Sequence, residues 1–195
     1  MLCFFIVIVA YMLGSIPMGL LLTKFMGRGD LRKVGSGNIG ATNVMRVGGL
    51  RMAGAVWILD MLKAMLAVWL GTWAYGTGFG AWCGFFAIVG HCFPIWLKFR
   101  GGKGISSLFG TLLAISPIMF IVCGIEWLIV ALSSGKSSAG AVVVFCLMPI
   151  FGFVMNSSVG WAFLAIALLC AIRHTNNIMR LINGTESIIE WKWKK

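Results

Sequence analysis

Six long apolar stretches, separated by short polar segments, dominate this sequence. They cover approximately residues 1–22, 52–74, 79–97, 105–132, 139–155 and 160–172. An α-helix needs about 20 apolar residues to cross the hydrocarbon core of a bilayer. Of the 195 residues, 60% are hydrophobic and only 11% are charged, which leaves too few polar side chains to cover a water-soluble globule. The sequence therefore predicts an all-α integral membrane protein, with residues 1–195 forming a single domain.

The number of spans depends on the fourth stretch, which is too long for one untilted helix and contains Ser116-Pro117 near its middle. A proline inside a helix removes a backbone hydrogen bond. If the stretch divides there, the basic residues of segments 23–51 and 98–103 and of the tail from 173 share one side of the membrane. The positive-inside rule makes that side cytoplasmic. We therefore expect seven transmembrane helices, some of them short, with the N-terminus outside and the C-terminus in the cytoplasm.

The net charge of +11 fits this orientation and also suits an anionic substrate. We expect no nucleic-acid partner, because no soluble domain is present to display the charge. The six cysteines form no CxxC pair and mostly lie within apolar stretches, so we expect buried free thiols, no metal site and no cofactor. No basic segment precedes the first stretch and no cleavage site interrupts it, which predicts a retained helix.

The first polar motif lies between the first two apolar stretches. Its three glycines let the backbone turn tightly and present N–H groups to an anion, while its amide and hydroxyl side chains add neutral donors. The guanidinium that follows matches the geometry of a phosphate. A flexible linker is the alternative, but the density of polar groups favours an anion site. The motif comprises Gly35, Ser36, Gly37, Asn38, Gly40, Thr42, Asn43 and Arg46.

The second motif, Arg100-Gly101-Gly102-Lys103-Gly104, directly precedes an apolar helix. Helix N-termini attract phosphate through free N–H groups and the helix dipole, and glycines allow close approach. The motif is not a Walker A loop, because Gly104 follows the lysine and no glycine stands at position 97. A basic turn without a ligand is the alternative. His91 is placed to support this loop, either as a packed histidine or as a catalytic one.

The third motif is His174-Thr175-Asn176-Asn177-Ile178-Met179-Arg180, with Glu186 behind it. On one helix, His174, Asn177 and Arg180 would share roughly one face and could converge on a phosphate or a hydroxyl. The alternative is an interfacial helix end whose cationic side chains extend to the membrane surface.

Two smaller groups of polar residues accompany these motifs. Asp60 and Lys63 lie at i and i+3 inside an apolar stretch, where charges are usually paired or functional, and we expect a structural pair near the site. Ser137 and Ser138, beside a lysine, could close a phosphate site.

Three basic, glycine- or amide-rich motifs on one side of a membrane indicate a substrate with more than one phosphate-like group. The absence of a hydrophilic domain points to a lipidic second substrate. A membrane transporter of a phosphoester or other anion is the alternative from another class. Such a transporter would place its binding residues near mid-membrane and often shows inverted repeats.

In order and spacing, the motifs resemble those of the bacterial acyl-phosphate:glycerol-3-phosphate acyltransferases of the PlsY type. The resemblance rests on GSIP at 14–17, GSGNIGATNVMR at 35–46, GHCFPIWLKFRGGKG at 90–104 and HTNNIMRL at 174–181. It implies transfer of a fatty acyl group from acyl phosphate to the 1-hydroxyl of glycerol 3-phosphate. The products would be lysophosphatidic acid and phosphate, formed in the first step of phospholipid synthesis at the bacterial cytoplasmic (inner) membrane. It further implies functional coupling to the enzyme that makes acyl phosphate.

The resemblance also assigns roles to residues. The catalytic set would be Ser36, Arg46, Lys103, His174 and Asn177. Gly101, Gly102 and Gly104 would form the phosphate loop, Ser137 and Ser138 would face the site, and Glu186 would be structural. Either His174 or a substrate phosphate would accept the proton of the hydroxyl. Ala64 departs from the family pattern, in which glycine often follows the lysine.

The positions of the two histidines bear on the acyl donor. Glycerolipid acyltransferases that use acyl-CoA or acyl carrier protein commonly rely on an HxxxxD pair. His91 is followed five residues later by Trp96, and His174 by Met179, so neither histidine forms this pair. We therefore expect acyl phosphate as the donor.

Overall fold

The computed structural model describes residues 1–189. Lys192, Lys194 and Lys195, which contributed to the expected cytoplasmic placement of the tail, lie outside this part of the chain. The described residues fold into α-helices, two short 3-10 helices and connecting loops. The elements are α1 (Leu2–Ser15), α2 (Met18–Phe25), η1 (Leu31–Lys33), α3 (Ala41–Tyr75), α4 (Thr77–Cys92), η2 (Ile95–Leu97), α5 (Ile105–Ile115), α6 (Pro117–Ser134), α7 (Ser137–Met155), α8 (Ser157–Arg173) and α9 (Thr175–Ile182).

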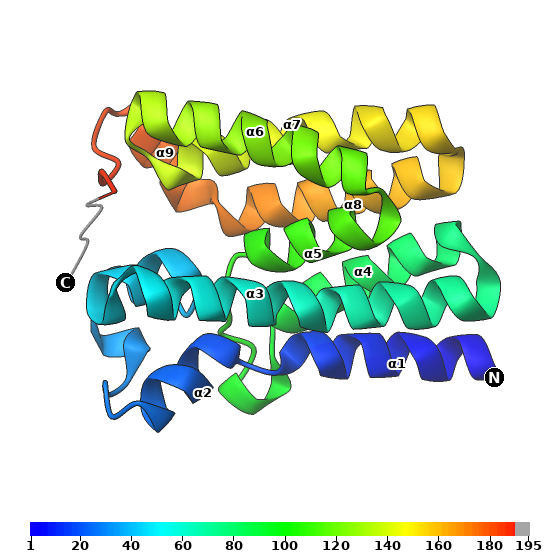
Figure 1. Ribbon diagram of the computed structural model, residues 1–195, viewed down its shortest axis with the longest axis horizontal. Helices are drawn as coiled ribbons and strands as arrows, with labels where there is room; N and C mark the ends of the chain where they lie inside the picture. The colour runs from blue at the N-terminus through cyan, green and yellow to red at the C-terminus, as the bar shows by residue number, and fades with distance from the viewer. Residues whose placement is uncertain (190–195) are drawn as a thin grey trace.

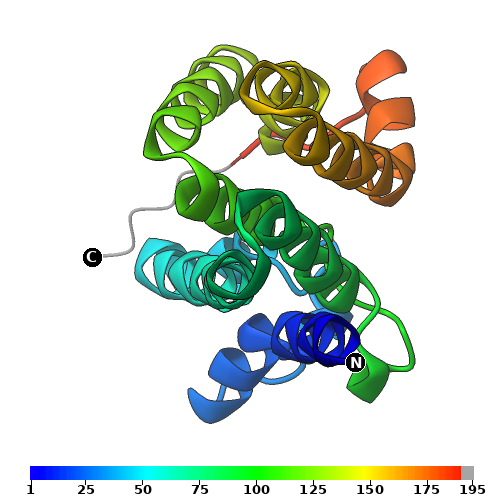
Figure 2. The same ribbon diagram turned by 90° about the vertical axis from the view of Figure 1, so that its right-hand side faces the viewer.

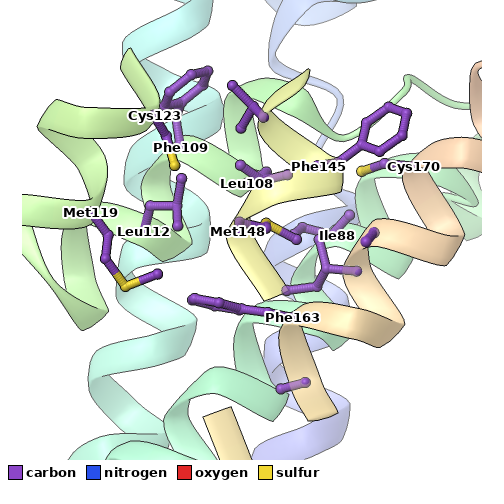
Figure 3. Close-up of a cluster of buried hydrophobic side chains, with 14 of the residues drawn as sticks. Ile88, Leu108, Phe109, Leu112, Met119, Cys123, Phe145, Met148, Phe163 and Cys170 are labelled. Atoms are coloured by element: carbon purple, nitrogen blue, oxygen red, sulfur yellow. The ribbon is translucent and has the colours of Figure 1, made fainter. Parts of the chain in front are cut away.

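The long helices run roughly side by side (Figure 1). α1, α3 and α4 pack against one another, and α6, α7 and α8 form a second group, with contacts between α4 and α8 joining the two. The short helix α5 lies between the groups and contacts α3, α4 and α6 (Figure 2). Side chains from both groups and from α5 meet in the largest apolar core, shown in Figure 3, which includes Ile88, Leu112, Met148 and Phe163.

The division of the fourth apolar stretch at Ser116-Pro117 is confirmed. α5 ends at Ile115 and α6 begins at Pro117, which occupies the first helical position, where its missing N–H would have no helical partner anyway. The Ser116 hydroxyl caps α6 by accepting a hydrogen bond from the Met119 N–H at 3.4 Å.

Helix lengths support a multi-pass membrane protein. Within residues 1–189, five segments are long and apolar enough to cross a bilayer, and a sixth is added if α8 and α9, bent by 65°, count as one span. At 11 residues, α5 is too short to cross alone. The count of seven spans and the orientation of the termini therefore stay predictions.

Several sequence expectations were wrong. The first stretch is not one helix, because Pro17 follows an extended Ile16 and separates α1 from α2. Segment 23–51 is not a loop throughout, since α3 starts at Ala41 and continues past Gly49, whose φ of +80° marks a kink. Two of the six free cysteines, Cys3 and Cys146, are exposed.

Candidate active site

A cavity of about 470 Å³ lies where four helices begin. The first residues of α3, α5 and α7 border it, as does His174, the N-cap of α9, although these helices start far apart in the sequence. Each helix N-terminus carries unpaired N–H groups and the positive end of the helix dipole. Arg46, Lys103 and Arg180 add cationic side chains to the lining. The part of the cavity at these helix starts, which we call its cationic end, is therefore suited to bind anions such as phosphate groups.

The first motif supplies the α3 side of the cavity, but not in the way expected. Ser36, Asn38, Gly40, Thr42, Asn43 and Arg46 line the cavity, whereas Gly35 and Gly37 do not. The buried Asn43 side chain organises the loop: its Nδ2 donates to the carbonyl oxygens of Leu31, Val34 and Asn38 at 2.8 to 3.2 Å. Its Oδ1 accepts the Ser36 N–H at 3.0 Å. These contacts engage the polar atoms of Asn43 in holding the chain.

The two glycines outside the cavity make the turn possible. Gly35 and Gly37 have φ values of +61° and +69°, which favour glycine. The Gly37 N–H donates to the Val34 carbonyl at 3.1 Å. Neither this N–H nor that of Ser36 is therefore left for a ligand, and the expected ring of inward N–H groups is smaller than the glycine pattern suggested.

The second motif departs from expectation in a similar way. The N–H groups of Gly101 and Gly102 donate to the carbonyl oxygens of Cys92 and His91 at 3.0 Å, so these two N–H groups are not available to a phosphate. Their own carbonyl oxygens accept hydrogen bonds from Arg173 at 3.0 Å. Only Lys103 and Gly104 of this motif line the cavity, together with Ile105 and Ser106 at the start of α5.

Gly102 is required by the packing of this loop against α4. A Cβ atom at position 102 would lie 2.0 Å from His91 Nε2, and one at position 101 would lie 2.2 Å from the His91 carbonyl oxygen. His91 therefore supports the loop through close backbone contact. The buried Asp60 and Lys63 complete this support: Lys63 Nζ lies 2.7 Å from Asp60 Oδ1 and 3.0 Å from His91 Nδ1.

The third motif closes the cavity from α9. α9 begins at Thr175, so His174 is its N-cap and does not share a helical face with Asn177 and Arg180. All three nevertheless line the same cavity. Lys103 Nζ donates a hydrogen bond to Asn177 Oδ1, which links the second motif to the third.

Glu186 ties the elements around the cavity together. Its Oε1 accepts hydrogen bonds from Ser138 Oγ at 2.7 Å and Asn177 Nδ2 at 2.6 Å, and its Oε2 accepts one from Arg180 Nε at 2.7 Å. Burial alone would raise the pKa of Glu186, but these hydrogen bonds and the charge of Arg180 lower it below the usual value. The carboxylate is therefore ionised and fixes α7 and α9 relative to each other.

His174 presents a neutral imidazole. Its Nδ1 lies 2.8 Å from the Cys170 carbonyl oxygen, and because a carbonyl can only accept, Nδ1 must carry the hydrogen. Burial lowers the pKa of His174 to about 4, and the nearby Lys103 contributes to the decrease. Nε2 is therefore a hydrogen-bond acceptor at neutral pH.

Burial also lowers the pKa of Lys103, which the charge of Glu186 partly opposes. A partly buried ammonium group that is hydrogen-bonded only to a neutral amide gains strongly when an anion enters the site.

Sequence reasoning missed the apolar residues that line the cavity, and it also missed three other contributions. Ser187 lines it and accepts a hydrogen bond from Arg46 Nη2 at 3.0 Å, and Ile189 lines it while its N–H donates to the Gly135 carbonyl at 2.7 Å. Arg173 does not line the cavity, but it holds the second motif in place by donating hydrogen bonds to the carbonyl oxygens of Gly101 and Gly102. The single basic residue before His174 was the only available signal for that role. Within residues 1–189, no group of three or more His, Cys, Asp or Glu side chains could hold a metal ion.

The fold and the cavity define a class: an all-helical, multi-pass integral membrane protein with a cationic site at the starts of its helices. Comparison with known proteins narrows this class. The family model for glycerol-3-phosphate acyltransferase matches residues 4–184, and the chain belongs to this family.

Relatives with curated names agree along nearly the whole chain. A glycerol-3-phosphate acyltransferase of Rhizobium etli is 43% identical over 183 residues, which are 93% of this chain and 89% of the relative. One of Gluconobacter oxydans is 43% identical over 187 residues, with 92% of this chain and 89% of the relative covered.

Solved structures agree as well. The crystal structure of PlsY (YgiH), an integral membrane glycerol 3-phosphate acyltransferase, in its glycerol 3-phosphate form matches with a TM-score of 0.91 and 33% identity. That match covers 97% of this chain and 96% of the other. The lysophosphatidic acid form matches with a TM-score of 0.90 and 31% identity, over 98% and 97% of the two chains. This chain is therefore a PlsY-type glycerol-3-phosphate acyltransferase.

Proposed function

We propose that this enzyme transfers a fatty acyl group from acyl phosphate to the 1-hydroxyl of glycerol 3-phosphate. The observation that carries the proposal is that one cavity combines the cationic end with an apolar part, called the apolar arm, which is lined by Leu50, Trp57, Phe109, Phe120 and Leu128. The relative PlsY (YgiH) was solved in glycerol 3-phosphate and lysophosphatidic acid forms, a substrate and a product of such a transfer. The donor must then be held in the same cavity, with its charged head beside the acceptor.

The cationic end can hold two phosphate groups close together. Arg46 lies in the first turns of α3 and is exposed, so its side chain can adjust its position to the phosphate of the acceptor. Lys103 lies just before α5, is more buried and contacts Asn177. Four helix N-termini add positive potential without a side-chain charge. Holding two anions in contact removes much of the entropic barrier to their reaction.

The apolar arm suits a fatty acyl chain. It is lined from the cationic end by Leu50 on α3 and Leu128 on α6, and further in by Trp57, Phe109 and Phe120. Leu50 and Leu128 are exposed, so the arm opens sideways between α3 and α6, where the membrane would lie. A lipid-soluble donor can enter by this opening directly from the bilayer.

In the proposed reaction the 1-hydroxyl oxygen attacks the acyl carbonyl carbon. The new ester C–O bond forms, and the bond between that carbon and the phosphate oxygen breaks, which releases inorganic phosphate. His174 Nε2 accepts a hydrogen bond from the hydroxyl and orients it, and the released phosphate carries away the proton. Lys103 and Arg46 stabilise the negative charge that develops. Ser36 contributes a donor at the rim, without forming an acyl-enzyme.

Transport of a phosphoester, the alternative function, is disfavoured by the distribution of polar residues. The cationic side chains gather where helices begin, and the arm that leads away from them is apolar. A transport path would need polar groups beyond the site.

The test uses purified protein in detergent, glycerol 3-phosphate, and either acyl phosphate or acyl-CoA, without metal or nucleotide. We expect lysophosphatidic acid with acyl phosphate and essentially none with acyl-CoA. Product formed without a closed compartment excludes pure transport. Comparable rates with acyl-CoA would refute the donor assignment.

The setting of the enzyme forms part of the proposal. A bacterial cytoplasmic membrane location, seven spans and a single domain fit the sequences of its bacterial relatives and the charge distribution along the chain. Functional coupling to the enzyme that makes acyl phosphate follows from the instability expected of a free activated donor.

A further inference from the structure

The apolar arm of the cavity contains two glycines that nothing in the reaction explains. Gly54 on α3 and Gly124 on α6 both line the arm, and a Cβ atom built on either would meet nothing within 4 Å. Most other helical glycines here are crowded: a Cβ at Gly14 would lie 1.9 Å from the Ala87 carbonyl oxygen. Gly54 and Gly124 are therefore not required for helix packing, and their effect is to leave space.

The arm has a defined end one turn beyond these glycines. Trp57 lies three residues after Gly54 on α3, and Phe120 lies four residues before Gly124 on the antiparallel α6. Phe109 joins the two aromatic rings, with centroid distances of 6.2 Å to Trp57 and 6.0 Å to Phe120. These three side chains form an aromatic wall that stops a chain coming from the cationic end.

We infer that Gly54 and Gly124 determine which acyl-chain lengths the enzyme accepts, by keeping the last turn of the arm open as far as the aromatic wall. This inference rests on the proposed function, since it takes the acyl chain of the donor as the occupant of the arm. Continuity supports that choice: the arm begins at the catalytic end and opens to the membrane beside the exposed Leu50 and Leu128.

The length of the space between the two glycines and the aromatic wall can be expressed as a number of methylene groups of the acyl chain. One helical turn rises about 5.4 Å, which corresponds to about four methylene groups of an extended chain. Each methylene group that loses its apolar contact weakens binding about fourfold. Filling the space at Gly124 should therefore penalise long donors strongly and leave short donors unaffected.

The experiment measures kcat/KM for acyl phosphates of 8 to 18 carbons with purified wild type, Gly124→Leu and Gly54→Leu. In both variants we expect kcat/KM for the 16-carbon donor, relative to the 8-carbon donor, to fall at least tenfold. Phe120→Ala, which opens the wall, should shift the preference toward longer donors. Ile121→Phe and Ile58→Phe add bulk at similar depth on exposed faces of the same helices and should leave the profile unchanged.

Folding is not expected to limit the test, because both glycines have ordinary helical backbones and leucine favours helix more than glycine does. An unchanged chain-length profile in both glycine variants, or an equal loss with all donors, would overturn the inference. Failure of the proposed function is distinguishable, since it would show as absent turnover of the wild type with every acyl phosphate.

Discussion

At the scale of single residues, the site separates side chains that hold the loops from side chains that are free to meet substrate. Asn43 and Glu186 use their polar atoms on neighbouring protein groups, and they set positions. Arg46 and Lys103 keep donors available at the cavity, with Ser187 and Asn177 as partners that an anion can replace. Substitutions of the two groups should therefore have different signatures.

Replacing Arg46 or Lys103 with Ala should lower kcat/KM about ten- to a hundredfold while the protein stays folded. The reason is the loss of one charge-assisted phosphate contact, worth about 1.5–3 kcal/mol. Arg46→Lys should restore activity only in part, because a lysine cannot make the two parallel hydrogen bonds of a guanidinium. Steady-state kinetics in detergent provides the measurement.

The matched controls are Arg51→Ala and Lys98→Ala, which remove exposed charges of the same kinds outside the cavity lining. Near-native kinetics in the Arg46 and Lys103 variants, or equal losses in the controls, would contradict the assignment of these residues to the site.

His174→Ala should raise KM for glycerol 3-phosphate about tenfold and change kcat little, because one orienting hydrogen bond is lost. Since the folded pKa of His174 is about 4, kcat of the wild type should show no His174 inflection between pH 5.5 and 8. A fall of kcat with an apparent pKa near 6.5 that disappears in His174→Ala would identify His174 as the general base instead.

The same pKa makes a prediction for stability. A histidine in the unfolded chain has a pKa of about 6.5, whereas the pKa of His174 in the folded protein is about 4. Between these two pH values the unfolded chain therefore binds a proton at this position and the folded protein does not. The contribution of the neutral imidazole is therefore present above pH 6.5 and is lost as pH falls from 6.5 toward 4. Between pH 6.5 and 4, the unfolding temperature of the wild type should therefore fall more than that of His174→Ala, as measured by thermal unfolding.

At the scale of elements, close helix packing depends on particular glycines. α1 and α4 approach so closely that a Cβ at Gly14 would lie 1.9 Å from the Ala87 carbonyl oxygen, and one at Gly90 would lie 2.2 Å from the Tyr11 carbonyl oxygen. Both obstacles are backbone atoms, which cannot turn aside as a flexible side chain can. Small residues at such positions are typical of helix contacts within membranes.

Gly14→Ala and Gly90→Ala should therefore each lower stability by about 1–3 kcal/mol, since the two helices must separate to admit the methyl group. Gly54→Ala places the same methyl group in open space on α3 and should leave stability unchanged or raise it by up to about 1 kcal/mol. Thermal unfolding of the three variants in one detergent is the comparison. Equal stabilities of all three would show that α1 and α4 are not packed this closely.

At the scale of the whole molecule, hydropathy and charge predicted the helical membrane class and the break at Ser116-Pro117, because both depend on local composition. The motifs also indicated which parts of the chain form the cavity. The roles of Gly101 and Gly102 could not be predicted, because they depend on the His91 ring and on Arg173, which only the tertiary fold brings together. The contribution of Ser187 depends in the same way on Arg46, 141 residues away.

The orientation of the molecule in the membrane leads to the last prediction. The α3–α4 and α7–α8 connections, at Gly76 and Asn156, carry no charge, whereas the loops holding Arg28 to Lys33, Lys98 to Lys103 and Lys136 are basic. Single cysteines at 77 and 157 in a cysteine-free variant should thus react with an impermeant thiol reagent from outside the cell. Cysteines at 30, 136 and, near position 102, at the exposed Arg100, because Gly102 itself has no room for a Cβ, should react only after permeabilisation. Position 136 is the decisive one, because it follows the short α5 and α6: labelling there from outside would mean that 105–134 crosses the membrane once, and the seven-span topology would be wrong.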